Sequence, residues 1–201
     1  MKTTAPPTRR RYRMVARAEA ARATRERVLA AAWRRFADLP YEDVRLADVA
    51  ADANVSVQTV HASFGAKERL FVAAWRWAIG PEGARRDRAP IGDVRAAIRL
   101  LYDSYELQGD ASLRLLAEED RIPAIREMTD AGRAWHRAWV ERTFAPLLRG
   151  SRGAARERRT VALVVATDIL VWKLLRREMR LERPTAERIV IDMVTATKGA
   201  P

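Results

Sequence analysis

The stretch of sequence that decides the fold is RLADVAADANVSVQTVHASF, residues 45–64. Its apolar residues recur every three or four positions, which predicts a short helix over Leu46–Ala53 and a second that ends near Phe64. Ser56 is placed to cap the second helix, and Asn54 tolerates the left-handed backbone that a tight turn requires. Two short helices joined by such a turn predict a helix-turn-helix.

The second helix has an apolar inner face and a polar outer face. Val60 and Phe64 are four residues apart and are expected to point into the core. Small and polar side chains on the outside suit base edges in the major groove of DNA, where glutamine pairs with adenine and apolar groups meet the thymine methyl. The pattern alone also fits an ordinary solvated helix. The candidates for contact with base edges are Val57, Gln58, Thr59 and Ala62.

Further motifs lie on both sides of this unit. The segment RERVLAAAWRRF precedes it, and the full stretch reads PYEDVRLADVAADANVSVQTVHASFGAKERLFVAAW. These contain an apolar helix ending in Phe36, an Asp-Val-Ala, an Ala-Asn-Val-Ser turn, a Thr-Val-His before Phe64, and a Lys-Glu before Leu70. At this spacing, residues 25–75 resemble the N-terminal domain of TetR-type transcription regulators. The resemblance implies an all-α protein with a DNA-binding head and a second helical domain.

The resemblance also implies contacts with phosphates. Lys67, at the start of the next helix, is expected to meet a phosphate, and Arg45, Ser63 and Thr24 are lesser candidates. His61 stands where the family usually has tyrosine; a histidine N–H suits a phosphate, although a surface histidine without a role is the alternative. Departures from the family pattern include Pro40 and Asn54 in place of glycine, and Arg45 in place of threonine.

The charge of the chain is uneven. It has 201 residues, with 38 Lys and Arg against 26 Asp and Glu, for a formal net charge of +12. Nine of the basic residues lie within residues 1–27, where only Glu19 and Glu26 oppose them. A basic arm over residues 1–23 is expected either in the minor groove of DNA, whose potential attracts arginine, or as a solvated tail.

Composition argues against several other functions. The chain has no Cys, which excludes disulfides, thiolate catalysis and Cys-based zinc sites, and two His are too few for a His-based metal site. We find no His-Glu-x-x-His and no Gly-rich phosphate loop, so neither a catalytic residue nor a metal is expected, although an all-helical enzyme is a distant alternative. The longest apolar run, Val161–Trp172, is too short to cross a membrane, which favours a soluble cytoplasmic protein.

We expect a DNA-binding domain over residues 24–79 and a ligand-binding and dimerisation domain over 80–201. The first helix is predicted from Thr24, as its N-cap, to Ala37, and Gly80-Pro81 should end the helix that begins at Lys67. The further helices predicted from periodicity are Asp93–Leu107, Ala111–Asp120, Pro123–Phe144, Ala154–Arg180 and Thr185–Thr197.

The second domain has candidates for a ligand pocket and for an interface. Aromatic and apolar side chains at helical spacing can line a pocket or simply form core. The pocket candidates are Tyr102, Tyr105, Met128, Trp135 and Trp139. The last two helices are apolar on more than one face, which fits a homodimer interface or a monomer core. Asp168 lies in this apolar stretch, and it should pair with Lys173, with an arginine across an interface, or with a cationic ligand.

Together these features predict a sequence-specific transcriptional regulator. The reading we favour is a repressor that binds double-stranded DNA at a palindromic operator as a homodimer and is released by an unidentified small molecule, with no other cofactor and no membrane. The alternative is a basic architectural protein that binds DNA without choosing a sequence.

Overall fold

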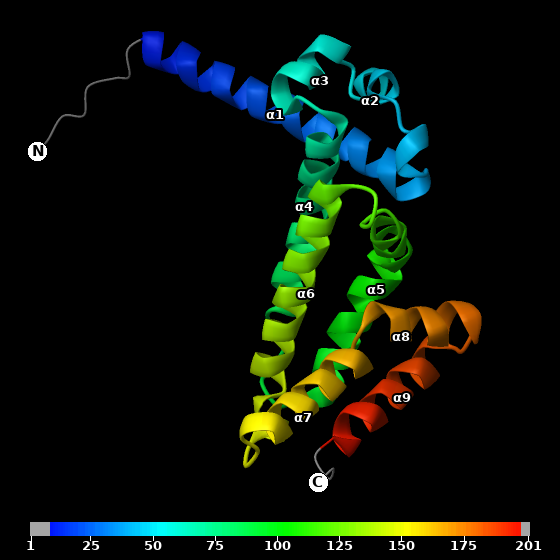
Figure 1. Ribbon diagram of the computed structural model, residues 1–201. Coiled ribbons are helices and arrows are strands. Elements are labelled where there is room, and N and C mark those ends of the chain that lie inside the picture. The colour runs from blue at the N-terminus through cyan, green and yellow to red at the C-terminus, as the bar shows by residue number, and fades with distance from the viewer. Residues whose placement is uncertain (1–8, 198–201) are drawn as a thin grey trace, which may run out of the picture. The chain divides into compact units, whose positions relative to one another are not determined.

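The computed structural model describes residues 9–197, and this part of the chain consists of helices and loops without strands (Figure 1). The all-α class predicted from the sequence is confirmed. The chain divides into two compact units, with the division between Trp77 and Ala78.

The first unit is built from α1 (Arg9–Asp38), a 3-10 turn at Tyr41–Asp43, α2 (Leu46–Asp52), α3 (Val57–Phe64) and the first half of α4 (Lys67–Arg86). The buried face of α1 forms the centre of its core. The principal buried residues are Val28, Leu29, Ala32, Phe36, Val49, Val60, Leu70 and Phe71. Burial of such side chains contributes about 25 cal/mol per Å² of apolar surface. This burial stabilises α2, α3 and the 3-10 turn, which are too short to persist alone.

Local signals in the turn between α2 and α3 behave as the sequence predicts. The side chain of Ser56 accepts a hydrogen bond from the backbone N–H of Thr59 at 3.1 Å, which caps α3. Asn54 has a φ of 53°, so it adopts the left-handed conformation expected of it. The helix-turn-helix is therefore set by residues within the motif itself.

The start of the first helix was predicted wrongly. α1 begins at Arg9, so Thr24 lies in the middle of a 30-residue helix and is not its cap, and residues 9–17 are helical. Between Arg9 and Thr24 the sequence is dominated by alanine and arginine, which have high helix propensity, and it contains no Gly or Pro. The rest of the expected arm, residues 1–8, lies outside the described residues.

The second unit contains the end of α4, α5 (Val94–Ala117), α6 (Pro123–Thr143), a 3-10 turn at Ala145–Leu148, α7 (Gly153–Ala166), α8 (Ile169–Lys173), the π-helical turn η3 (Leu174–Glu178) and α9 (Arg183–Ala196). One core joins them. Its largest fully buried side chains are Trp139, Trp172, Tyr102, Phe144, Ile98 and Leu101.

Two expected helix ends are absent. α4 continues through Pro81 to Arg86, because the preceding Gly80 has no Cβ to clash with the proline ring. α5 is a single helix through Gly109, where two helices were predicted. A Cβ on Gly109 would lie 2.4 Å from the ring of Trp172, so this glycine allows Trp172 to approach the helix and does not mark its end.

The predicted helix Ala154–Arg180 is in fact broken in the middle. α7 ends at Ala166, and α8 begins after Asp168, whose Oδ1 accepts a hydrogen bond from the N–H of Leu170 at 2.8 Å. Asp168 is therefore a helix cap, and the pairing with Lys173 was wrong, because the Lys173 ammonium pairs with Glu178 at 2.7 Å. The Thr-Asp pair that interrupts the apolar run is the signal for this break.

Candidate nucleic-acid interface and apolar pocket

The outer face of α3 is free in the first unit. Val60 and Phe64 anchor the helix, with 1% and 8% of their surface exposed, whereas Gln58, His61, Ala62 and Ser63 are exposed. Val57 is 38% exposed, so its side chain is available on this face for contact with a thymine methyl. The structure thus brings the predicted base-reading candidates together on one short surface.

Thr59 is less available than the other candidates. It is half-buried, and its hydroxyl lies 2.9 Å from the hydroxyl of Ser56. Part of its hydrogen-bonding capacity therefore belongs to the cap of α3. Gln58 is the exposed amide of this face and can present a donor and an acceptor together.

The predicted phosphate contacts have different surroundings. Arg45 is exposed at the N-cap position of α2, and its side chain does not cap the helix. Lys67 is half-buried: its Nζ donates to the carbonyl oxygen of Glu42 at 3.1 Å and lies 4.4 Å from the centroid of the Tyr41 ring. Burial lowers the pKa of Lys67 from its ordinary value. Two of its three N–H donors are left for a phosphate.

Two arginines that the sequence did not single out support α3 from α1. Arg25 donates through Nη1 to the carbonyl oxygen of Ser63 at 3.2 Å, and its guanidinium lies 4.3 Å from the ring centroid of Phe64. Arg27 donates through Nε to the carbonyl oxygen of Ala53 at 3.3 Å. Both arginines satisfy carbonyls at the ends of short helices, which periodicity cannot predict because these carbonyls are distant in sequence.

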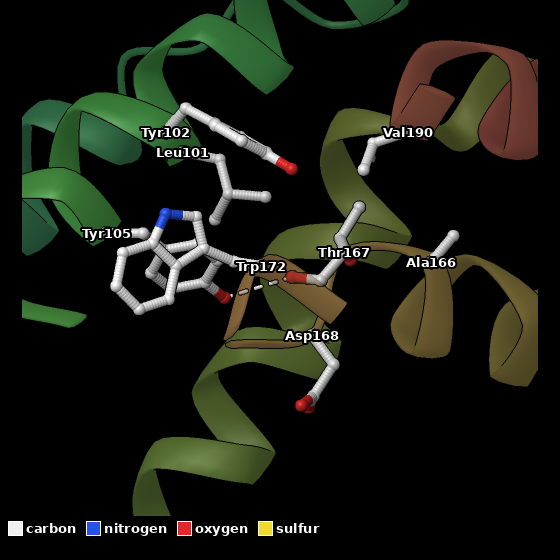
Figure 2. Close-up of a pocket in the computed structure, with 8 residues that line it drawn as sticks. All are labelled: Leu101, Tyr102, Tyr105, Ala166, Thr167, Asp168, Trp172 and Val190. Atoms are coloured by element: carbon white, nitrogen blue, oxygen red, sulfur yellow. Dashed lines mark hydrogen bonds between the residues drawn. The ribbon is translucent and has the colours of Figure 1, made fainter. Parts of the chain in front are cut away.

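The second unit contains a small apolar pocket whose lining side chains pack so closely that it has no room for a water molecule in this conformation. Figure 2 shows the side chains that line it: Leu101, Tyr102, Tyr105, Ala166, Thr167, Asp168, Trp172 and Val190. The hydroxyl of Tyr105 donates to the carbonyl oxygen of Thr167 at 2.9 Å, whereas the buried hydroxyl of Tyr102 has no hydrogen-bond partner. The carboxylate of Asp168 points away from the tyrosines (Figure 2).

The five predicted ligand residues do not form one site. Tyr102 and Tyr105 line the pocket, whereas Met128 is buried elsewhere on α6. Trp135 and Trp139 instead flank the guanidinium of Arg86, at 4.5 Å and 4.6 Å from their ring centroids. Spacing on α6 grouped the two tryptophans correctly, but it did not reveal that a cation of the chain itself lies against them.

Arg86 starts a chain of hydrogen bonds that leads to the pocket wall. The side chain is buried, and its Nη2 donates to Nδ1 of His136 at 2.8 Å. The other ring nitrogen of His136 must then carry the proton, and it lies 3.1 Å from the hydroxyl of Thr167, which donates in turn to the carbonyl of Leu163. Burial, together with the charge of Arg86, lowers the pKa of His136 to about 3.

Among residues 9–197, which the structure describes, no group of three His, Cys, Asp or Glu side chains is placed to hold a metal ion. No helix there is both long enough and apolar enough to span a membrane.

Comparison with known proteins agrees with this geometry. Residues 28–74 match the family model described as bacterial regulatory proteins of the tetR family, which covers α2, α3 and most of the α1 core face. No curated protein matches the chain in sequence.

Solved structures share the fold over most of the chain. A transcriptional regulator from Rhodococcus sp. Rha1 has a TM-score of 0.68 at 19% identity, covering 86% of this chain and 95% of its own. A transcriptional regulator from Pseudomonas aeruginosa PAO1 has a TM-score of 0.67 at 19% identity, and the match covers 90% of this chain and 91% of that one. A transcriptional regulator from Saccharomonospora viridis, in complex with choline, has a TM-score of 0.64 at 21% identity, and the match covers 85% of this chain and 95% of that one. At these identities the likeness establishes the fold.

Proposed function

We propose that this chain, whose N-terminal domain is that of the TetR family of transcriptional regulators, is a ligand-responsive repressor that binds a palindromic operator as a homodimer. The observation that carries the proposal is the exposed face of α3, where Val57, Gln58 and Ala62 stand free on a helix anchored by Val60 and Phe64. Such a rod fits the major groove, which is about 12 Å wide.

Exposed apolar side chains on the last helices support a homodimer. Val161 and Val165 lie four residues apart on α7 and are 44% and 53% exposed, and Met193 on α9 is 39% exposed. Side chains at this spacing share one helix face. A two-fold interface over α7 and α9 buries this face against its own copy. A homodimer carries two copies of α3, and helix-turn-helix dimers bind half-sites about 34–36 Å apart.

The pocket of the second unit supports response to a small molecule. Tyr102 contributes a buried hydroxyl without a partner, which a ligand satisfies if the closely packed side chains that line the pocket move apart. The regulator from Saccharomonospora viridis shows that a protein of this fold was crystallised with choline. Thr167 joins the pocket wall to Arg86 in the last turn of α4, so a ligand that moves Thr167 acts on the helix that follows the DNA-reading motif. Release from DNA requires different ligand affinities in the two states.

Selection of operator DNA from a random pool by the full-length chain tests the proposal. We expect enrichment of a palindrome, and we expect Gln58→Ala to lose about 1–3 kcal/mol of discrimination at one position in each half-site. Gln108→Ala is the matched control, because it removes the other glutamine of the chain, which lies on α5. A pool that stays random would contradict the proposal and favour the architectural alternative.

A further inference from the structure

The N-terminal half of α1 extends beyond the packed part of the first unit as a free helix, shown in dark blue in Figure 1. Residues 13–23 are all exposed, and burial on this helix begins with Thr24 and Val28. From Arg9 to Ala23 the helix is about 22 Å long at 1.5 Å per residue. A solvated helix of this length is marginally stable on its own, so a partner would stabilise it.

The charges on this free helix are sorted by face. Arg13 and Arg17 are one helical turn apart, and the same face continues through Thr24 to Arg27. The opposite face carries Glu19 and the ion pair between Arg22 and Glu26, whose atoms lie 3.0 Å apart. The basic face is thus free of neighbouring acids, and the acidic residues lie on the far side.

The basic face is on the side of the helix that meets the DNA-reading motif. Arg27, at the C-terminal end of this face, donates to Ala53 at the end of α2, and the adjacent Arg25 donates to Ser63 of α3. Because α1 is one continuous helix, Arg13 and Arg17 extend the same line of positive charge past the end of the motif. Their natural counter-charge is the phosphate backbone beside the bases that α3 would read.

We propose that the free half of α1 is a helical phosphate-binding rail that holds the DNA backbone flanking each half-site through Arg13 and Arg17. This inference rests on the proposed function, because it needs a DNA-bound α3. A helix is about 10–12 Å in diameter, whereas the minor groove is about 6 Å wide, so helical residues 9–23 do not fit the first of the two alternatives for the basic arm, an arm in the minor groove. The rail spans about six base-pair steps of 3.4 Å.

Salt titration of binding to the selected operator tests the rail. The wild type is compared with the double variant Arg13→Ala/Arg17→Ala and with Arg22→Ala, which removes an arginine from the far face of the same helix. Alanine keeps the helix propensity high, so circular dichroism should show that all of them are folded. At about 0.9 per phosphate, we expect the double variant to reduce the slope of log K against log salt by about two for each protomer, or about four for the dimer on its palindrome, and Arg22→Ala to leave the slope unchanged.

The same proteins on trimmed DNA give a second readout. Shortening the duplex to the palindrome itself should weaken the wild type to the level of the double variant and leave the double variant unaffected. Equal slopes for the double variant and Arg22→Ala, or equal losses on trimmed DNA, would overturn the rail. In either case the selected palindrome is retained by all variants, whereas failure of the proposed function removes sequence preference from the wild type as well.

Discussion

The imidazole of His61 donates through Nδ1 to the carbonyl oxygen of Gly65 across 2.9 Å, because a carbonyl can only accept. In the neutral ring this leaves Nε2 as an acceptor. A tyrosine, which the resemblance to TetR-type proteins leads one to expect at this exposed position, would instead present a hydroxyl that can donate to a phosphate.

Replacing His61 by tyrosine should consequently tighten DNA binding. We expect roughly a tenfold gain in operator affinity for His61→Tyr, because its hydroxyl can donate to a phosphate whereas Nδ1–H of His61 is already used on Gly65. Fluorescence anisotropy at constant ionic strength measures this. Equal affinities of the two proteins would show that position 61 makes no phosphate contact.

Lys67 should contribute to stability as well as to DNA affinity. Lys67→Met removes the hydrogen bond to Glu42 and the contact with the Tyr41 ring, so we expect a loss of about 1 kcal/mol in the free energy of unfolding. DNA affinity should fall for all sequences alike, because phosphates carry no sequence information. Urea unfolding and operator titration measure the two effects.

The control for Lys67 is Lys173→Met, which removes an equal charge from an ion pair with Glu178. Surface ion pairs contribute little, so this variant should stay within about 0.5 kcal/mol of the wild type. If Lys67→Met binds DNA more weakly but unfolds with an unchanged free energy, Lys67 contributes to phosphate binding and not to stability.

Local chemistry explains which parts of the fold the sequence predicts. Ser56 and Asn54 act on their own backbone neighbours, so the cap and the turn of the motif were confirmed. Gly80, Pro81 and Gly109 resemble breakers, but their effect depends on what they contact. Gly109 receives the ring of Trp172 from far along the chain, and no window of sequence around residue 109 contains that information.

The sequence likewise predicts the candidate DNA-reading face better than the candidate ligand residues. The exposed residues of α3 follow from helical periodicity, because the buried partners Val60 and Phe64 fix which face points outward. The sequence analysis assigned the two tryptophans of α6 to a ligand pocket, because a sequence cannot show that Arg86 of α4 packs against both rings. Contacts with a buried cation or a distant carbonyl depend on the tertiary structure, whereas the face of a helix follows from the local sequence.

A charge on the exposed face of α7, near its C-terminal end, should dissociate the proposed dimer. Val165 is 53% exposed, so Val165→Glu can fold as a monomer while each protomer places a carboxylate in the proposed interface. We expect sedimentation to show a monomer and operator affinity to fall by at least a hundredfold, because the second half-site no longer binds intramolecularly.

Leu107→Glu is the matched control for Val165→Glu. Leu107 is 65% exposed on α5 and does not belong to α7 or α9. The Leu107→Glu variant should remain dimeric and bind the operator with unchanged affinity. Dissociation by Leu107→Glu, with Val165→Glu still dimeric, would move the interface to α5.

Gly109→Ala should destabilise the second unit strongly. The added Cβ would lie 2.4 Å from the Trp172 ring, and Trp172 is held in place by its Nε1 hydrogen bond to Glu106 at 3.0 Å. Overpacking of this kind costs about 1–3 kcal/mol, more than the helix propensity that alanine adds. Gly132→Ala on α6, where no atom lies within 4 Å of the added carbon, should be neutral or stabilising. Comparable thermal unfolding of the two variants would contradict the close approach.

The stability of the second unit should fall with acidification through His136. Its pKa is about 3 in the folded chain, against about 6.5 when unfolded, so the unfolded chain binds the extra proton between these values. The free energy of unfolding therefore decreases as the pH falls below about 6.5, by an amount on the order of 3 kcal/mol by pH 4.

His136→Gln provides the comparison, because its amide can accept from Arg86 and donate to Thr167 without titrating. Denaturant unfolding at a series of pH values should give a shallower slope for this variant between about pH 6.5 and about pH 4, where most carboxylates are still ionised. If the free energy of unfolding changes with pH equally in wild type and variant, His136 is protonated in the folded chain while it stays beside Arg86. The hydrogen-bonded chain from Arg86 to Thr167 would then accommodate two adjacent cations, and it would not support coupling between the pocket and α4.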